Sequence, residues 1–363
     1  MRAIRTKKKV VAWSVLGFVV ASLEASIFYR AYRLHVIASA TAIDAATGID
    51  ETLFAKIGGI DQWIGIRGRR RDNPVVLIVH GGPGFALSPL PRSMFFDWTK
   101  DFTLALWDQR GAGKTFGRSG PVDAGVTIER MALDGVEVAE FLRARLQRPK
   151  IILVGVSWGS SLGVQMAKAR PDLFYAYVGT GQSVNQHKYK ALAYAQLLAE
   201  ARTRNDRRAI EELEANGPPP YDSISRETVY TKWATAYEPG TPSRWAAAST
   251  VLFESEAGWR DLRDYVRGLT TSDAHFREQV KKVDLLSLGT DFGVPFFVFQ
   301  GAKDNVTPVA AVEAYMDRVT APRKQLVLIP GAGHNVIATR QQEFLKLLTE
   351  RVRPLAMRAR DQR

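Results

Sequence analysis

The chain has no cysteine among its 363 residues. Disulfide bonds, thiolate-bound zinc and a cysteine nucleophile are therefore excluded, although the absence of cysteine identifies no cellular compartment. Histidine is scarce, with five residues, so the choice of a catalytic base is narrow. We also find no internal repeat, no long low-complexity segment and no motif for binding nucleic acid.

The composition is that of a folded chain with basic ends. Hydrophobic residues make up 46% of the sequence and charged residues 24%, enough for one large core with an inserted subdomain. The net charge is +13, and much of it lies in two terminal clusters: Arg2, Arg5, Lys7, Lys8 and Lys9, and Arg351, Arg353, Arg358, Arg360 and Arg363. Such clusters fit attraction to a membrane surface at least as well as nucleic acid, and many basic tails are simply solvated.

An apolar run extends from Val10 to Tyr29, and Glu24 is the only charged residue within it. A helix needs about 20 such residues to cross a bilayer, so we predict that residues 1–40 form a basic segment and a membrane anchor. More basic residues lie before the run than closely after it. Because a positively charged flank favours the cytoplasmic side of a membrane, we expect the N-terminus in the cytoplasm and the body of the chain outside. The alternatives are a cleaved secretory signal, which would release the body, and an amphipathic helix packed on the protein.

Strands and helices alternate along the body of the chain. Two short strands around Gly58-Gly59 predict an edge hairpin, and the apolar runs that follow predict a mostly parallel sheet in an α/β fold. The alternation stops between residues 183 and 287, where the spacing is helical. We therefore expect a core formed by residues 50–182 and 288–355, with a helical cap inserted at 183–287.

The central motif is Gly155-Val156-Ser157-Trp158-Gly159, a G-x-S-x-G sequence between an apolar strand and an amphipathic helix. A tight turn in this context exposes a serine hydroxyl, and the glycines let neighbouring backbone pass without Cβ clashes. We predict that Ser157 is a nucleophile. The alternative is a serine that caps the following helix.

A serine nucleophile needs a base and an acid that orients the base. His334 lies in a glycine-rich loop after the last predicted strand, and Asp304 follows the preceding strand. The alternative role for Asp304 is an Asx turn or a helix cap before Pro308. The order Ser157, Asp304, His334 is that of α/β-hydrolases.

Two backbone amides are expected to hold the oxyanion. One is the N–H of Trp158, the residue after the nucleophile. The other comes from the loop after the strand at 75–79, where Gly82 is the candidate because a glycine lets the backbone approach the developing charge.

Three motifs together resemble the proline iminopeptidase (prolyl aminopeptidase) family of α/β-hydrolases. They are His80-Gly81-Gly82-Pro83-Gly84, Asp108-Gln109-Arg110-Gly111-Ala112-Gly113 and the elbow around Ser157, and the resemblance covers about residues 50–350. It implies an α/β-hydrolase fold with a cap, Ser157, Asp304 and His334 as the triad, and a turn at 108–113 that shapes the pocket floor. The family usually has serine where Thr115 stands.

The resemblance also implies cap glutamates that bind the free amine of the substrate. Glu238 and Glu254 are the candidate counterparts, with an exposed charge on a helix as the alternative for each. The anchor is not typical of cytoplasmic members of that family.

We therefore expect a membrane-anchored serine hydrolase that releases N-terminal proline, or a similar residue, from peptides. The alternative substrate class is esters of apolar acids, and a remote alternative is a hydrolase-like binding protein without activity. Aspartate-nucleophile relatives are disfavoured because serine occupies the elbow. No metal ion, organic cofactor or nucleic acid is expected, and the oligomeric state stays open.

Overall fold

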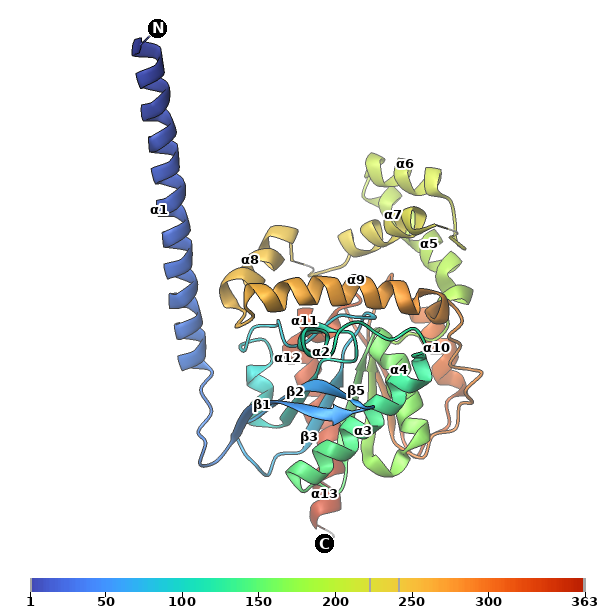
Figure 1. Cartoon of the computed structure of the whole chain (residues 1–363). Helices are drawn as coiled ribbons and strands as arrows, with labels where there is room; N and C mark the ends of the chain where they lie inside the picture. Colours follow the sequence, from blue (N-terminus) through green and yellow to red (C-terminus); the bar gives the residue numbers. More distant parts are fainter. Residues whose placement is uncertain (1, 222, 241, 362–363) are drawn as a thin grey trace.

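A single sheet of eight strands forms the centre of the molecule, which a computed structural model describes over residues 2–221, 223–240 and 242–361. The strand order is β1-β2-β4-β3-β5-β6-β7-β8 (Figure 1). The strands are β1 Ile49–Ile57, β2 Ile60–Gly68, β3 Val75–Val79, β4 Thr103–Trp107, β5 Ile151–Val156, β6 Phe174–Thr180, β7 Phe296–Gly301 and β8 Lys324–Ile329.

The first two strands form the predicted hairpin. They pair antiparallel about a turn in which Gly58 and Gly59 both have positive φ, a conformation that glycine adopts without steric cost. Strand β2 also pairs antiparallel with β4, and every other neighbouring pair is parallel. The mostly parallel α/β sheet expected from the sequence is confirmed.

Helices cover both faces of the sheet, and this explains why β3 and β5 are apolar along their length and why β7 begins with four apolar residues. One buried cluster joins the sheet to α3 (Ile128–Leu146), α4 (Trp158–Ala169) and α10 (Val309–Arg318). The other joins it to α12 (Gln341–Leu347) and α13 (Arg353–Asp361). Two short helices, α2 (Gly113–Ser119) and α11 (Val336–Thr339), lie next to the strand ends.

Five helices lie between β6 and β7. They are α5 (Gln186–Thr203), α6 (Arg207–Asn216), α7 (Ile224–Ala236), α8 (Arg244–Glu254) and α9 (Trp259–Lys281). Helices α5 to α7 share a small buried cluster of their own. The long helix α9 crosses one end of the body and packs on α2, while α5, α6 and α7 stand beyond it (Figure 1).

The N-terminal segment is one long helix, α1 (Arg2–Ala40), which stands away from the body along most of its length (Figure 1). Its segment Trp13–Ala40 is long and apolar enough to cross a membrane, and the most apolar part of that segment is not buried within the protein. The helix thus extends past the apolar run ending at Tyr29. Its closest contacts with the body are to α8.

Candidate active site

Ser157 lies at a sharp turn between β5 and α4. Its φ is 53° and its ψ is −120°, a left-handed conformation that is strained for a residue with a side chain. Close packing holds the turn: a Cβ added to Gly159 would lie 2.1 Å from the carbonyl oxygen of Val79, and one on Gly155 would lie 2.7 Å from that of Gly159. Only glycine fits these two positions without a shift of the backbone.

The structure brings Ser157, His334 and Asp304 together in one chain of hydrogen bonds. Nε2 of His334 lies 2.8 Å from Oγ of Ser157, and Nδ1 of His334 lies 2.9 Å from Oδ2 of Asp304. Both distances are within hydrogen-bonding range. The three residues follow β5, β8 and β7, whose carboxyl ends meet at one edge of the sheet. The arrangement can move a proton from the serine hydroxyl to the imidazole.

The carboxylate of Asp304 accepts hydrogen bonds at both oxygens. Oδ2 accepts from Nε2 of Gln300 at 2.6 Å and from Oγ1 of Thr307 at 2.7 Å, in addition to His334. Oδ1 accepts from the backbone amides of Val306 and Thr307, both at 2.8 Å. Asp304 therefore forms the Asx turn considered as the alternative and contacts His334 as well. Gln300 and Thr307 were not identified from the sequence.

Two neighbouring carboxylates act on His334. Burial by itself would lower the pKa of His334, because it disfavours a positively charged ring. The negative charge of Asp304, with a contribution from Glu238, outweighs the effect of burial and raises the pKa of His334 above its ordinary value. Burial also raises the pKa of Glu238 to about 7. Each of the two groups therefore influences the charge of the other.

The two predicted oxyanion donors belong to segments that adjoin Ser157. Trp158 is the first residue of α4, so its amide belongs to the positive end of that helix. Gly82 lies in the loop after β3, and a Cβ added to the adjacent Gly81 would lie 3.2 Å from Cβ of Ser157. The loop and the elbow are thus in direct contact.

Gln109 bridges that loop and the elbow from the end of β4. Its Nε2 donates to the carbonyl of His80 at 2.8 Å, and its Oε1 accepts from the indole of Trp158 at 3.0 Å. Its backbone amide donates to Nε2 of His80 at 3.1 Å. Burial lowers the pKa of His80 to about 4, so the ring is neutral, and its Nδ1 proton points to the carbonyl of Gly81.

The turn at 108–113 was expected to shape the pocket floor. Instead, the structure buries the side chains of Asp108, Gln109 and Arg110 behind the loops. Oxygens of Asp108 accept from three backbone amides, two of them at residues 87–88. Thr115 has a hydroxyl group, as does the serine that the family usually has at this position. Its Oγ1 donates to the carbonyl of Asp108 at 2.6 Å and accepts from the amide of Trp63 at 2.8 Å.

The two cap glutamates have different surroundings. Glu238 is 8% exposed, and its Oε1 accepts from the amide of Asn335, the residue after His334, at 3.0 Å. Among the side chains that the structure describes, no lysine or arginine forms an ion pair with Glu238. Glu254 ends α8 and pairs with Arg33 of α1. The structure brings Glu238 to the triad and does not bring Glu254 there.

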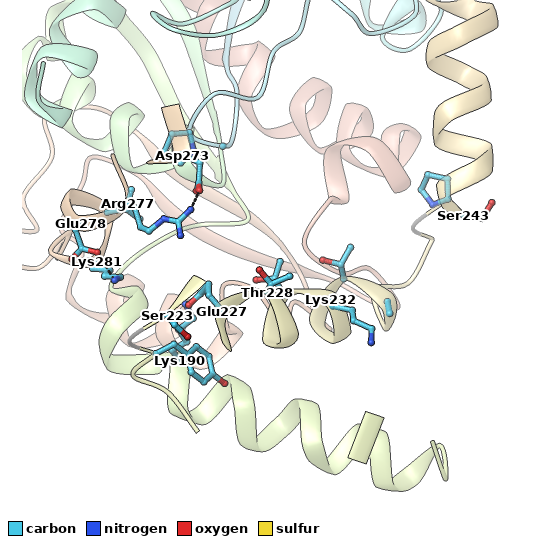
Figure 2. A pocket seen from close by; sticks show the side chains of 18 residues that line it. Lys190, Ser223, Glu227, Thr228, Lys232, Ser243, Asp273, Arg277, Glu278 and Lys281 are labelled. Carbon is cyan, nitrogen blue, oxygen red and sulfur yellow. Dashed lines mark hydrogen bonds and ion pairs between the residues drawn. The ribbon is translucent and has the colours of Figure 1, made fainter. Parts of the chain in front are cut away.

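A cavity of about 940 Å³ is lined mostly by α5, α7 and α9 of the cap and reaches Gly82 and Pro83. Figure 2 shows its charged lining from α5, α7 and α9, where the charges lie in ion pairs: Lys190 with Glu227, Arg277 with Asp273 and Lys281 with Glu278. Over the described ranges, no group of three or more histidine, aspartate or glutamate side chains could hold a metal ion.

Comparison with known proteins agrees with this geometry. Residues 76–347 match the model of the alpha/beta hydrolase family. A probable aminopeptidase of Bacillus subtilis is 26% identical over 301 residues, covering 82% of this chain and 94% of the relative. A probable proline iminopeptidase of Streptomyces coelicolor is 27% identical over 305 residues, covering 77% of this chain and 87% of the relative.

Solved structures share the fold at lower identity. A proline iminopeptidase-related protein of Thermus thermophilus superposes with a TM-score of 0.56 at 18% identity, covering 85% of this chain and 99% of its own. A membrane phospholipase A described as a bacterial virulence factor superposes with a TM-score of 0.60 at 16% identity, covering 92% of this chain and 96% of its own.

The Gln109 bridge generates a prediction. We expect Gln109→Leu to lower kcat/KM by about 10- to 100-fold, because the loop of His80 and the elbow at Trp158 lose their common support and a small displacement of the predicted oxyanion donors is costly. The pH midpoint should stay unchanged, since the substitution leaves the neighbours of His334 in place. Steady-state kinetics over a range of pH measures both quantities.

The matched control is Gln342→Leu, which removes a similar side chain from the surface of α12. Near-wild-type turnover in both variants, each folded by circular dichroism, would contradict a role for the bridge.

Proposed function

Because this chain belongs to the alpha/beta hydrolase family, we propose that it is a serine hydrolase that cleaves an amide or ester through an acyl-enzyme at Ser157. The observation that carries the proposal is the 2.8 Å contact between Oγ of Ser157 and Nε2 of His334, extended at 2.9 Å to Asp304. An intact chain of this kind disfavours a binding protein without activity.

In the proposed reaction, Oγ of Ser157 attacks the substrate carbonyl as its proton passes to Nε2 of His334. Asp304 stays ionised, fixes the ring and stabilises its positive charge. The amides of Gly82 and Trp158 hold the oxyanion. His334 then gives the proton to the leaving amine or alcohol, and a water molecule activated by the same ring releases the acyl group from Ser157.

For the substrate, we favour peptides with a free N-terminal proline or a similar residue. A protonated amine close to the scissile bond needs an acidic partner in a pocket screened from water. Glu238 offers such a carboxylate, buried beside His334 and without a basic partner among the described side chains. Relatives named aminopeptidase and proline iminopeptidase support this choice.

Esters of apolar acids are the second candidate. One of the solved structures with this fold is a phospholipase and another is an esterase. The apolar helix α1 adds a reason to consider substrates that partition into membranes. We further propose that α1 anchors the chain in a membrane with the catalytic body on the extracytoplasmic side, or is cleaved as a signal so that the body is secreted.

The first prediction from the proposed function concerns the nucleophile. Ser157→Ala should lower turnover by on the order of 10⁴-fold or more, because the acyl-enzyme cannot form, while the fold stays intact. Turnover of a proline arylamide and a short-chain aryl ester measures the loss, and thermal unfolding serves as the control. Near-wild-type activity on every substrate would exclude Ser157 as the nucleophile.

The second prediction concerns pH. His334 must be neutral to accept the proton, and its pKa is raised, so kcat/KM for a neutral ester should fall as pH decreases through a midpoint above about 6.5. For a proline arylamide the fall should be steeper below about pH 7, because Glu238, whose pKa is about 7, then also loses its charge. Identical profiles for the two substrates would count against amine binding by Glu238.

The third prediction tests Glu238 directly. Glu238→Gln should lower kcat/KM for a proline arylamide by about 10-fold or more, since one charged hydrogen bond is lost, and should spare the ester at alkaline pH. It should also move the ester midpoint to lower pH, because the ring of His334 loses a neighbouring carboxylate.

The matched control is Glu254→Gln, which should leave both substrates unaffected. Equal loss on both substrates after Glu238→Gln would indicate damaged cap packing, and no loss on either would remove Glu238 from the site.

The fourth prediction concerns α1. The full chain should sediment with membranes and resist high-salt washing, because the apolar surface of α1 holds it. The pair Leu16→Arg and Val20→Arg should shift the protein to the supernatant, since each charge costs about 2.5–3.5 kcal/mol within a membrane. Release of the unaltered chain by salt alone would indicate a surface patch, and a shortened soluble chain would indicate a cleaved signal.

A further inference from the structure

Helix α1 is fixed to the cap at one place. The guanidinium of Arg30 donates to the carbonyl oxygens of Leu252 at 2.6 Å, Ser255 at 3.0 Å and Ala257 at 2.8 Å. These oxygens lie at the end of α8 and in the short connection to α9, where backbone carbonyls have no partner within the helix. Arg30 follows the apolar run directly, so the end of that run lies at the junction of α8 and α9.

Two further contacts strengthen this attachment. The ring of Tyr29 meets that of Phe253 edge to face, with centroids 5.3 Å apart. Arg33, one turn further along α1, pairs with Glu254. An aromatic contact and two arginines therefore fix the orientation of the cap relative to α1.

Exposed tryptophans lie on both helices that meet at this junction. Trp245, in the first turn of α8, is 75% exposed, and Trp259, the first residue of α9, is 78% exposed. Arg260 and Arg263 follow on α9 with largely exposed side chains. We refer to these four residues as the cap rim. Exposed tryptophan beside arginine is the side-chain pattern that proteins place at the boundary between lipid and water.

The cap rim also adjoins the cavity. Pro242 and Ser243 line the cavity and lead directly into α8, and the later turns of α9 line it through Asp273 and Arg277. Figure 1 shows the cap helices on the side of the body from which α1 extends towards its N-terminus. A moderate tilt, which membrane-spanning helices commonly have, would bring the cap level with a bilayer surface.

We propose that the cap rim seats on the surface of the bilayer that α1 crosses, and that the cavity takes its substrates from that surface. This inference rests on the proposed anchoring by α1 and narrows the substrate class to amphiphilic peptides or esters held in the membrane. A bilayer is favoured over a protein partner because the cap rim is continuous with the end of the apolar run of α1.

The absence of cysteine makes a direct test possible. Trp245→Cys and Trp259→Cys each place a single thiol in the full chain for a fluorophore sensitive to polarity. The protein is reconstituted in vesicles of phosphatidylcholine and phosphatidylglycerol. We expect a blue shift in emission and quenching by lipids with a nitroxide near the headgroup. Leu133→Cys, at an exposed position on α3 outside the cap, is the control and should show neither effect.

A second measurement distinguishes docking of the cap rim on the bilayer from anchoring of the chain by α1. The full chain with Trp245→Gln and Trp259→Gln should remain in the membrane pellet and keep its activity on a water-soluble ester. Its activity on an ester embedded in vesicles should fall by about 10-fold, because two interfacial aromatic side chains are lost.

Three results would overturn the inference. In the first, the labels at 245 and 259 are as accessible to water as the label at 133 while the protein stays in the pellet; anchoring would then hold without docking. In the second, the blue shift depends on protein concentration in detergent and needs no lipid, which would identify a second copy as the occupant. In the third, the tryptophan pair loses activity equally on both esters.

Discussion

The close approach of the first turn of α4 to the end of β3 is the contact on which the site depends. Gly159 leaves room for the carbonyl oxygens of Val79 and His80 where a side chain would otherwise stand. This packing holds Ser157 in a left-handed conformation whose strain is of order 1–3 kcal/mol. It also brings the loop that carries Gly82 against the elbow, so one contact positions both the proposed nucleophile and the proposed oxyanion donors.

The two carboxylates beside His334 differ in the number of hydrogen bonds that the protein donates to them. Asp304 accepts five hydrogen bonds, from two backbone amides and three side chains. For Glu238 the structure gives a backbone amide as donor, and burial raises its pKa to about 7. The charge of Glu238 is therefore the one that a bound ligand can alter, because a cation beside its carboxylate would favour the ionised form.

The sequence predicts the sheet and the three residues of the triad because each follows an apolar strand, and parallel strands end at one edge. It does not predict the roles of Gln109, Gln300 or Thr307. Gln109 joins segments far apart in the chain, and Gln300 and Thr307 act through a turn at Asp304 whose side-chain contacts follow no hydrophobic pattern. Glu238 came from a family resemblance. Glu254 did not reach the site, because the packing of α1 on α8 gives it Arg33 as a partner, and the apolar run alone does not indicate that contact.

Glycines at the contact let α9 pack directly against two loops of the body. A Cβ on Gly84 would lie 2.7 Å from the carbonyl oxygen of Gly268, and a Cβ on Gly268 would lie equally close to that of Gly111. Ser272 adds a hydrogen bond to Gly111 at 2.9 Å. Lifting α9 would break this backbone contact with the loop that carries Gly82. A side chain at Gly84 or Gly268 would therefore separate α9 from the body and disturb the loop that carries Gly82.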